Sequence, residues 1–295
     1  MNILIAGATG LIGTVLTEQF ASEGHQVQIL SRNTFRKNRE NISYAGWDGH
    51  KISGLRTGFD VIINLSGASI GNHGWTRSYR KELHQSRILA TRAFADLIND
   101  AGKKPTVFIN ASATGFYGNR PSEELTEFSA GGTGFLAHLT QDWENEALKI
   151  RSRTVCLRFG MVLSAKDGAF PKLKKAIKAG ICGIPGSGRQ VVPWIHILDI
   201  PGIVNFIIEN ENIKGPVNAV APEKTSLKLI LKLTGKKKGA FMYLPIPAFL
   251  IRLFMGGRSS LLLHNQHVTP SKLISNGFVF KFPDIRQTFD DLSNK

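Results

Sequence analysis

The sequence predicts an α/β protein in which a doubly wound parallel sheet carries a smaller C-terminal α+β lobe. Three observations predict this fold class. Apolar, strand-like runs alternate with amphipathic helical segments as far as Gly160, the first run leads directly into a glycine-rich turn, and the rhythm changes after Gly160. Strands that alternate with helices are joined by crossovers, and such crossovers produce a parallel sheet with helices on both faces.

The expected elements follow from hydrophobic periodicity. Apolar runs predict strands over residues 3–6, 27–30, 42–47, 61–65, 107–111, 154–159 and 216–219. Apolar side chains at helical spacing predict helices over residues 11–23, 75–99, 134–150 and 171–179.

The turn after the first strand is the most informative segment. It reads Gly7-Ala8-Thr9-Gly10-Leu11-Ile12-Gly13. Gly7 suits a turn, Gly10 allows the backbone to approach a pyrophosphate closely, and Gly13 allows the next helix to pack against the strand. That helix would direct its first amides and the positive end of its dipole at the phosphates. Because strand, turn, helix and second strand occur in order, residues 7 to 13 are predicted to bind a dinucleotide. A glycine turn without a ligand is the alternative.

The end of the second strand indicates which dinucleotide. It reads Ser31-Arg32-Asn33, with Arg36 and Lys37 shortly after and no carboxylate before Glu40. NAD enzymes place an acidic residue here to hold the ribose 2′-hydroxyl, whereas a hydroxyl and a guanidinium suit a 2′-phosphate. Ser31 and Arg32 therefore predict NADP rather than NAD. A solvated basic loop is the alternative.

Composition bounds the class of protein. The 295 residues suffice for one large domain with a smaller lobe. Cys156 and Cys182, the two cysteines, lack metal-ligand spacing, so we expect no metal site and no disulfide framework. The chain begins with a core strand rather than a basic leader, and no uncharged apolar run reaches 18 residues. We therefore expect a cytoplasmic protein without a membrane partner.

The positive charge is concentrated in the second part of the chain. Residues 1–165 hold 18 Lys and Arg against 14 Asp and Glu, a net charge of +4, and residues 166–295 hold 19 against 8, a net charge of +11. The basic part would attract a small anionic substrate. A basic surface that only aids solubility is the alternative. No nucleic-acid motif occurs, so nucleic acid is not expected as a partner, and no feature of the sequence specifies an oligomeric state.

Several segments together resemble the extended short-chain dehydrogenase/reductase superfamily. They are the glycine turn at residues 7–13, Asn64-Leu-Ser-Gly67, Ile109-Asn-Ala-Ser-Ala-Thr-Gly-Phe-Tyr-Gly118 and Leu157-Arg-Phe-Gly160. Further segments resemble its NAD(P)-dependent epimerase/dehydratase-like subgroup, whose members end in a short C-terminal module of unknown function. These are Trp75-Thr76, Ser86-Arg87, Asp142-Trp-Glu144, Gly186-Ser-Gly-Arg-Gln190, Trp194-Ile-His-Ile197, Pro216-Val-Asn-Ala219, Leu244-Pro-Ile-Pro-Ala248 and Ser275-Asn-Gly-Phe278.

The resemblance covers essentially the whole chain and implies a Rossmann-type core. On this basis residues 1–215 form an NADP-binding domain, with residues 166–190 contributing to the substrate lobe, and residues 216–295 form the smaller lobe. The resemblance places Leu65, Ser66 and Gly67 beside the cofactor ribose and nicotinamide, and Trp47 and Asp48 near the adenine. An ordinary turn is the alternative for each of these two segments.

The resemblance also identifies catalytic candidates and one departure. Ser112 corresponds to the serine that hydrogen-bonds the reacting oxygen. The superfamily's acid/base pair is a Tyr with a Lys four residues later, but Phe135 and Leu139 stand at those positions and carry no proton. Tyr117 and His138 are the remaining candidates for a proton donor, and apolar packing or substrate contact is the alternative for both.

Two further residues are candidates for substrate binding. Arg189 follows three glycines in a loop that could approach a phosphate or carboxylate closely, although an exposed loop arginine is the alternative. His196 lies just beyond, and a lone histidine is more often structural.

Two functions remain open. The first is an NADP-binding, epimerase-like oxidoreductase for a small anionic substrate, with a sugar nucleotide as one candidate. The second is an NADP-binding redox sensor or interaction protein without turnover, which the loss of the Tyr/Lys pair favours.

Overall fold

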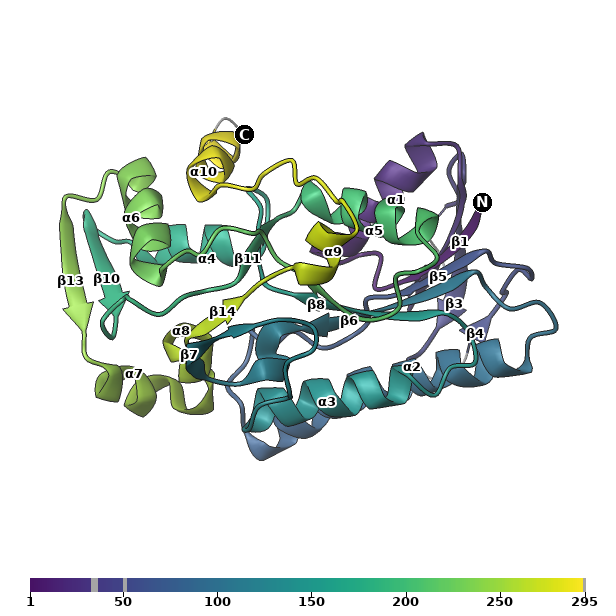
Figure 1. The fold of residues 1–295 in the computed structure, drawn as a ribbon, viewed down its shortest axis with the longest axis horizontal. Coiled ribbons are helices and arrows are strands. Elements are labelled where there is room, and N and C mark those ends of the chain that lie inside the picture. Colours follow the sequence, from purple (N-terminus) through teal and green to yellow (C-terminus); the bar gives the residue numbers. More distant parts are fainter. Residues whose placement is uncertain (33–36, 50–51, 294–295) are drawn as a thin grey trace.

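The computed structural model describes residues 1–32, 37–49 and 52–293 (Figure 1). Within these residues, eight strands form one sheet. Their order is β12 (Gly215–Ala219), β8 (Thr154–Phe159), β6 (Val107–Ala113), β5 (Val61–Asn64), β1 (Asn2–Ala6), β2 (Gln26–Ser31), β3 (Ile42–Trp47) and β4 (Ile52–Ser53). All neighbouring pairs are parallel except β3 with β4.

The first strand lies inside this sheet. Ile3 of β1 is in register with Val27 of β2 on one side and with Val61 of β5 on the other. The chain therefore winds outward in one direction through β2 and β3 and in the other through β5, β6, β8 and β12. This order confirms the predicted doubly wound sheet. It also brings the carboxyl ends of β1 and β5 together at the edge where the winding direction changes, and this edge is the position of the ligand-binding crevice in such sheets.

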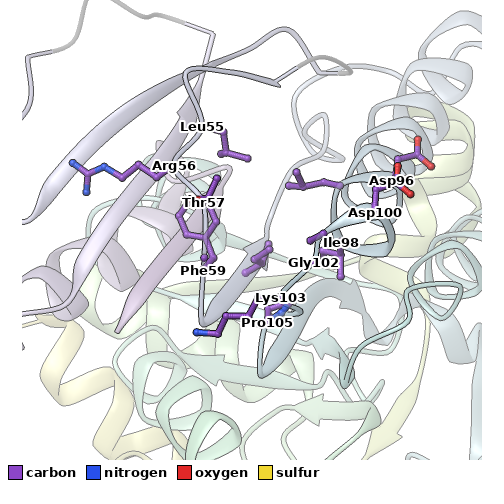
Figure 2. A pocket seen from close by; sticks show the side chains of 14 residues that line it. Leu55, Arg56, Thr57, Phe59, Asp96, Ile98, Asp100, Gly102, Lys103 and Pro105 are labelled. Carbon is purple, nitrogen blue, oxygen red and sulfur yellow. The ribbon is translucent and has the colours of Figure 1, made fainter.

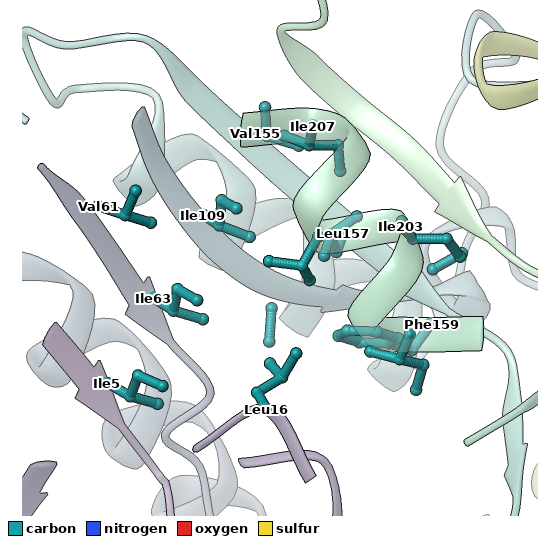
Figure 3. Close-up of a cluster of buried hydrophobic side chains, with 14 of the residues drawn as sticks. Ile5, Leu16, Val61, Ile63, Ile109, Val155, Leu157, Phe159, Ile203 and Ile207 are labelled. Atoms are coloured by element: carbon teal, nitrogen blue, oxygen red, sulfur yellow. The ribbon is translucent and has the colours of Figure 1, made fainter. Parts of the chain in front are cut away.

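Helices cover both faces of the sheet. One face packs against α1 (Leu11–Ser22) and α5 (Asp199–Glu209), and the other against α2 (Arg77–Asp100) and α3 (Phe135–Ala147). Figure 3 shows the first of these cores, in which Leu16 of α1 and Ile203 and Ile207 of α5 meet side chains of the central strands. Because both faces are covered, the central strands are apolar at consecutive positions rather than alternating.

The remaining elements build the smaller lobe at the opposite end from the N-terminus (Figure 1). Its strands form three two-stranded parallel sheets: β10 (Ile181–Pro185) with β13 (Met242–Ile246), β11 (Trp194–His196) with β9 (Met161–Leu163), and β14 (Gln266–Val268) with β7 (Arg120–Leu125). Its helices are α4 (Ala169–Ala176), α6 (Leu227–Lys238), α7 (Ala248–Met255), α8 (Ser260–Leu263) and α10 (Ile285–Ser293), with the 3₁₀ turn η2 (Gly256–Ser259). Two short elements pack on the main domain instead: α9 (Ser271–Ser275) on β12, and the 3₁₀ turn η1 (Thr114–Tyr117) on α3 and β8.

The boundary between the two parts differs from the expected position at residue 215. Strand β12 pairs with β8, so residues 216–219 belong to the main sheet rather than to the smaller lobe. The lobe also takes in β7, β9, β10, β11 and α4, which precede β12 in the chain. Among the described helices, none is long and apolar enough to cross a membrane.

Two element boundaries matter for the site. Helix α2 begins at Arg77 rather than at Trp75, because Thr76 caps it and its Oγ1 accepts from the Tyr79 amide at 3.2 Å. Strand β6 runs two residues further than expected, to Ala113. Ser112 is therefore part of a fully paired strand and not of the loop that follows it.

Candidate nucleotide-binding site

The glycine turn has a backbone that only glycine fits at two positions. Gly7 has a φ of +76°, and a Cβ there would lie 2.7 Å from the Leu65 carbonyl. A Cβ at Gly13 would lie 2.4 Å from the Gly7 oxygen and 2.5 Å from the Ala8 Cα. Helix α1 is thereby packed tightly on the turn, with Gly10 as its N-cap. The first amides of α1 thus lie at the carboxyl edge of the sheet, in a geometry that can accept a pyrophosphate.

The turn after β5 lies directly beside this glycine turn. The Leu65 amide donates to the Ala6 carbonyl at 3.0 Å, which joins the ends of β5 and β1. The buried Asn64 fixes the turn, because its Oδ1 accepts from the Ser66 amide at 3.1 Å and its Nδ2 donates to Asn110 Oδ1 at 2.8 Å. The structure therefore brings residues 65–67 next to residues 7–13, as the sequence predicts.

A buried arginine lies beneath the same turn. Arg87 donates to the Ala68 carbonyl at 3.0 Å and to the Leu83 carbonyl at 2.9 Å, and its guanidinium lies 5.1 Å from the Trp143 ring centroid. Burial lowers the pKa of Arg87 to about 10. A Cβ at Gly67 would lie 3.0 Å from the guanidinium carbon, so a larger residue there would require the Arg87 side chain to shift. Sequence reasoning assigned Arg87 no role, although it quoted the motif that contains it.

The residues predicted to hold the adenine end of the cofactor lie at the ends of β2 and β3. Arg32 is exposed immediately after β2, and Ser31 is buried at the end of that strand. Trp47 is also buried, and its ring meets Phe94 edge-on at 5.1 Å in the core. Asp48 is exposed at the same edge of the sheet. Asn33 and Arg36 lie outside the described residues.

A buried polar network surrounds the predicted catalytic serine. Ser112 Oγ donates to Glu144 Oε1 at 2.5 Å. Arg158 donates to both oxygens of Glu144, at 2.8 and 2.7 Å, and to the Tyr117 hydroxyl at 2.8 Å. The Tyr117 hydroxyl donates in turn to Asn218 Oδ1 at 2.7 Å. This network of hydrogen bonds links Ser112 of β6, Glu144 of α3, Arg158 of β8 and Asn218 of β12. It therefore crosses the core beside the three strands β6, β8 and β12.

This network holds the hydroxyls of Ser112 and Tyr117, whose catalytic roles stay predictions. The side chain of Ser112 is 3% exposed, and its single proton already points to Glu144. Tyr117 is fully buried, and burial raises the pKa of its phenol despite the nearby Arg158. A phenol held protonated among Arg158, Asn218 and the Thr126 carbonyl is a poor proton donor to a substrate. Sequence reasoning missed Glu144 and Arg158, although both lie in motifs that it quoted.

The positions of the missing Tyr/Lys pair are occupied by packing side chains. The Phe135 ring lies 5.3 Å from the Trp75 ring and 5.1 Å from the Arg80 guanidinium carbon. Leu139 is buried. Both side chains serve hydrophobic contacts, and neither can exchange a proton.

The two predicted substrate residues do not come together. Arg189 is exposed on the loop between β10 and β11. His196 is fully buried inside the smaller lobe, where its ring stacks on Phe282 at 3.9 Å and its Nε2 lies 3.3 Å from Asp291 Oδ2. This burial favours the structural alternative for His196, and its contact with substrate stays a prediction. Its residue type alone did not reveal this burial.

Two other cations of the lobe reach the main domain. Arg258 donates to the Gly71 carbonyl at 2.8 Å, and Lys172 Nζ donates to Asn72 Oδ1 at 3.2 Å. Both partners lie in the loop that follows β5 and leads away from the nucleotide site. The lobe thus contacts the main domain beside the crevice through positively charged side chains. The net charge of residues 166–295 was the feature of the sequence that indicated these two cations.

A cavity of about 750 Å³ lies elsewhere (Figure 2). Its walls include Phe59 and Pro105, which precede β5 and β6, and Ile98 near the end of α2. It therefore opens at the amino edge of the sheet, opposite the glycine turn, and is not the nucleotide site. In the part of the chain that the structure describes, no group of three His, Cys, Asp or Glu side chains could hold a metal ion.

Comparison with known proteins agrees with this geometry. The NAD dependent epimerase/dehydratase family matches residues 3–219, and a domain of unknown function (DUF1731) matches residues 246–292. The sheet order and the glycine turn are those of an extended short-chain dehydrogenase/reductase, as expected. The chain belongs to the NAD dependent epimerase/dehydratase family.

Relatives of nearly the same length exist in bacteria and mammals. Epimerase family protein YfhF of Bacillus subtilis is 36% identical over 99% of this chain and 98% of its own. Epimerase family protein SDR39U1 of Mus musculus is 32% identical over 99% of both chains. The crystal structure of human SDR39U1 (isoform 2) with NADPH is 30% identical, covers 100% of both chains and has a TM-score of 0.89. MoeE5 with UDP-glucose and NAD, at 16% identity and a TM-score of 0.77, shares the fold alone.

Proposed function

We propose that this protein binds NADP(H) in the crevice beside Gly7–Gly13 and acts as an epimerase-like oxidoreductase on a small anionic substrate. The observation that carries the proposal is the close packing of α1 on the glycine turn, which leaves helix N-terminal amides at the crevice. The exposed Arg32 stands directly after β2, where an NAD enzyme has a carboxylate. NADPH in the human SDR39U1 structure supports the same cofactor.

Arg32→Ala tests the choice of cofactor. The substitution removes a charge-assisted contact with the 2′-phosphate, so NADPH affinity should fall by about 1.5–3 kcal/mol while NADH affinity stays unchanged. Isothermal titration of both cofactors measures this. Arg56→Ala is the matched control, because Arg56 is also exposed but lies at the opposite edge of the sheet. An equal loss in both variants would contradict the assignment.

We place the substrate where the smaller lobe meets the loop after β5. Lys172 and Arg258 supply positive charge at this junction, and Arg189 extends from a neighbouring loop of the lobe. An anionic group fits this charge. Ser112 remains the proposed contact for a reacting oxygen. Its hydroxyl can serve there only as a hydrogen-bond acceptor, because it donates its own proton to Glu144.

Arg189→Ala separates the substrate site from the cofactor site. NADPH affinity should remain within error of the wild type, because Arg189 lies on the lobe. Turnover of a responsive anionic substrate should show a raised KM. Lys224→Ala serves as a control for charge, since Lys224 is exposed on the lobe as well. An unchanged KM in Arg189→Ala would remove Arg189 from the site.

A second function is favoured by a specific observation. Phe135 and Leu139 carry no proton, and the hydroxyls of Ser112 and Tyr117 are committed to buried partners. These features fit an NADP-binding redox sensor or interaction protein without turnover.

A substrate panel distinguishes the two functions. Positioned acid/base catalysis contributes about 10²–10⁴-fold in rate, so sugar nucleotides should turn over very slowly with this protein. The measurement is oxidation of NADPH and reduction of NADP⁺ across sugar nucleotides, carbonyl compounds and hydroxy acids. Turnover of one class that Ser112→Ala reduces would support the enzyme. Tight NADPH binding without turnover of any class would support the sensor.

A further inference from the structure

The far end of the smaller lobe exposes an apolar surface. Among the described residues, fourteen large apolar side chains are exposed, and eight of them lie between residues 241 and 261. The most exposed of these are Phe254 (82%), Phe241 (76%), Leu253 (72%) and Phe249 (65%). They come from α7 and from the start of β13, which lie together at the end of the molecule farthest from the N-terminus (Figure 1). Single exposed apolar residues are ordinary, but a concentration of this kind marks an interaction site.

The same surface lies in a segment with one sign of charge. Residues 224–283 contain ten Lys and Arg and no Asp or Glu. Arg252 lies between Phe249 and Leu253 at helical spacing, so it shares their exposed face of α7. Lys236 and Lys238 are exposed at the end of α6, just before Phe241. We call β13, α7 and the last turn of α6 the apolar–basic end.

The charge and the backbone of the apolar–basic end together indicate which kind of partner binds there. The exposed Asp290 lies 3.5 Å from Lys237 Nζ, but the other cations of this surface, Lys236, Lys238 and Arg252, would repel their copies across a symmetric dimer. Pro245 in β13 and Pro247 directly after it lack amide protons, which hinders the addition of another strand. Nucleic acid would match the charge but not the exposed Phe and Leu side chains of α7. Anionic lipid matches both, because apolar side chains enter the acyl boundary while Lys and Arg meet the headgroups.

We propose that the apolar–basic end docks on the surface of an anionic phospholipid bilayer. Helix α7 has eight residues and a length of about 12 Å, so it lies along the interface and does not cross it. The expectation that no membrane takes part rested on the lack of a spanning segment, which bears on crossing and not on surface attachment. The proposal is independent of the reaction, because these residues lie away from the glycine turn.

Vesicle co-sedimentation of the full chain tests this proposal. Wild type should sediment with vesicles that contain phosphatidylglycerol and not with vesicles of phosphatidylcholine alone, and salt should weaken the binding. The triple variant Phe249→Ser/Leu253→Ser/Phe254→Ser should lose binding by more than about tenfold, since its apolar area no longer enters the bilayer. Val279→Ser is the matched control, because Val279 is equally exposed in the same acid-free segment but lies outside β13 and α7.

NADPH titration verifies that each variant is folded, and its result does not depend on lipid. Failure of wild type to bind anionic vesicles would overturn the proposal. Equal binding by the triple variant would also overturn it. A concentration-dependent dimer in wild type that the triple variant abolishes would assign the surface to a second copy instead.

Discussion

Gly13→Ala should abolish measurable NADPH binding and lower the free energy of unfolding. The added Cβ would lie 2.4 Å from the Gly7 oxygen and 2.5 Å from the Ala8 Cα, distances that real Cβ atoms do not adopt. Both neighbours are backbone atoms of the turn itself, so they cannot move aside as a flexible side chain could. Helix α1 must therefore shift off the turn, which removes its first amides from the phosphate position.

We expect a loss of about 1–3 kcal/mol in stability from this overpacking, measured by urea unfolding. Gly102→Ala is the matched control, because a Cβ there meets nothing within 4 Å and the residue lies at the opposite edge of the sheet. It should retain wild-type NADPH affinity. Unchanged NADPH affinity in Gly13→Ala would show that the turn does not bind the cofactor.

Glu144→Gln should destabilise the fold by about 3–5 kcal/mol, the cost of breaking a buried ion pair by removing one partner. Glu144 and Arg158 are both almost fully buried, and Glu144 accepts two hydrogen bonds from Arg158 and one from Ser112. Without the carboxylate, the Arg158 charge remains in the core with neutral partners only. Urea unfolding of wild type and variant measures the difference.

Two further variants separate the ion pair from a general effect of the substitution. Glu123→Gln removes a carboxylate that pairs with Arg120 at the surface, and it should leave stability nearly unchanged. The double variant Glu144→Leu/Arg158→Met removes both buried charges and should recover much of the loss. Stability of Glu144→Gln equal to that of Glu123→Gln would contradict the assignment of the buried pair.

The sequence predicted those features that depend on neighbouring residues. The strand, glycine turn and helix at the start of the chain form a local unit, so their spacing predicted the turn at Gly7 and the tight packing at Gly13. The strand that carries Ser112 followed from the same kind of local pattern, although β6 runs two residues further than expected. Element types were therefore predictable where one short segment determines them.

Features that depend on distant contacts were not predictable in the same way. Trp47 is buried because Phe94 of α2 packs on it, and His196 is buried because Phe282 covers it. The hydroxyl of Ser112 is committed by Glu144 on α3. Each partner is far away in the sequence, so neither residue type nor spacing revealed whether these side chains face the core or the crevice.

The edge strand β12 shows the same limit of prediction from the sequence. Residues 216–219 read correctly as a strand, but their pairing with β8 depends on the whole order of the sheet. A change in rhythm after Gly160 indicated the smaller lobe, yet its segments interleave with the main domain along the chain. Composition could indicate that the lobe exists and is basic, but not which of its cations reach the loop after β5.

Side-by-side titration of NADPH and NADH into the wild-type protein tests the central claim most directly. The cradle at Gly7–Gly13 predicts that both cofactors bind, and Arg32 predicts that NADPH binds at least about tenfold more tightly, a difference of about 1.4 kcal/mol. Equal affinities for the two cofactors would contradict the role of Arg32, and the absence of binding by either would contradict the nucleotide site itself.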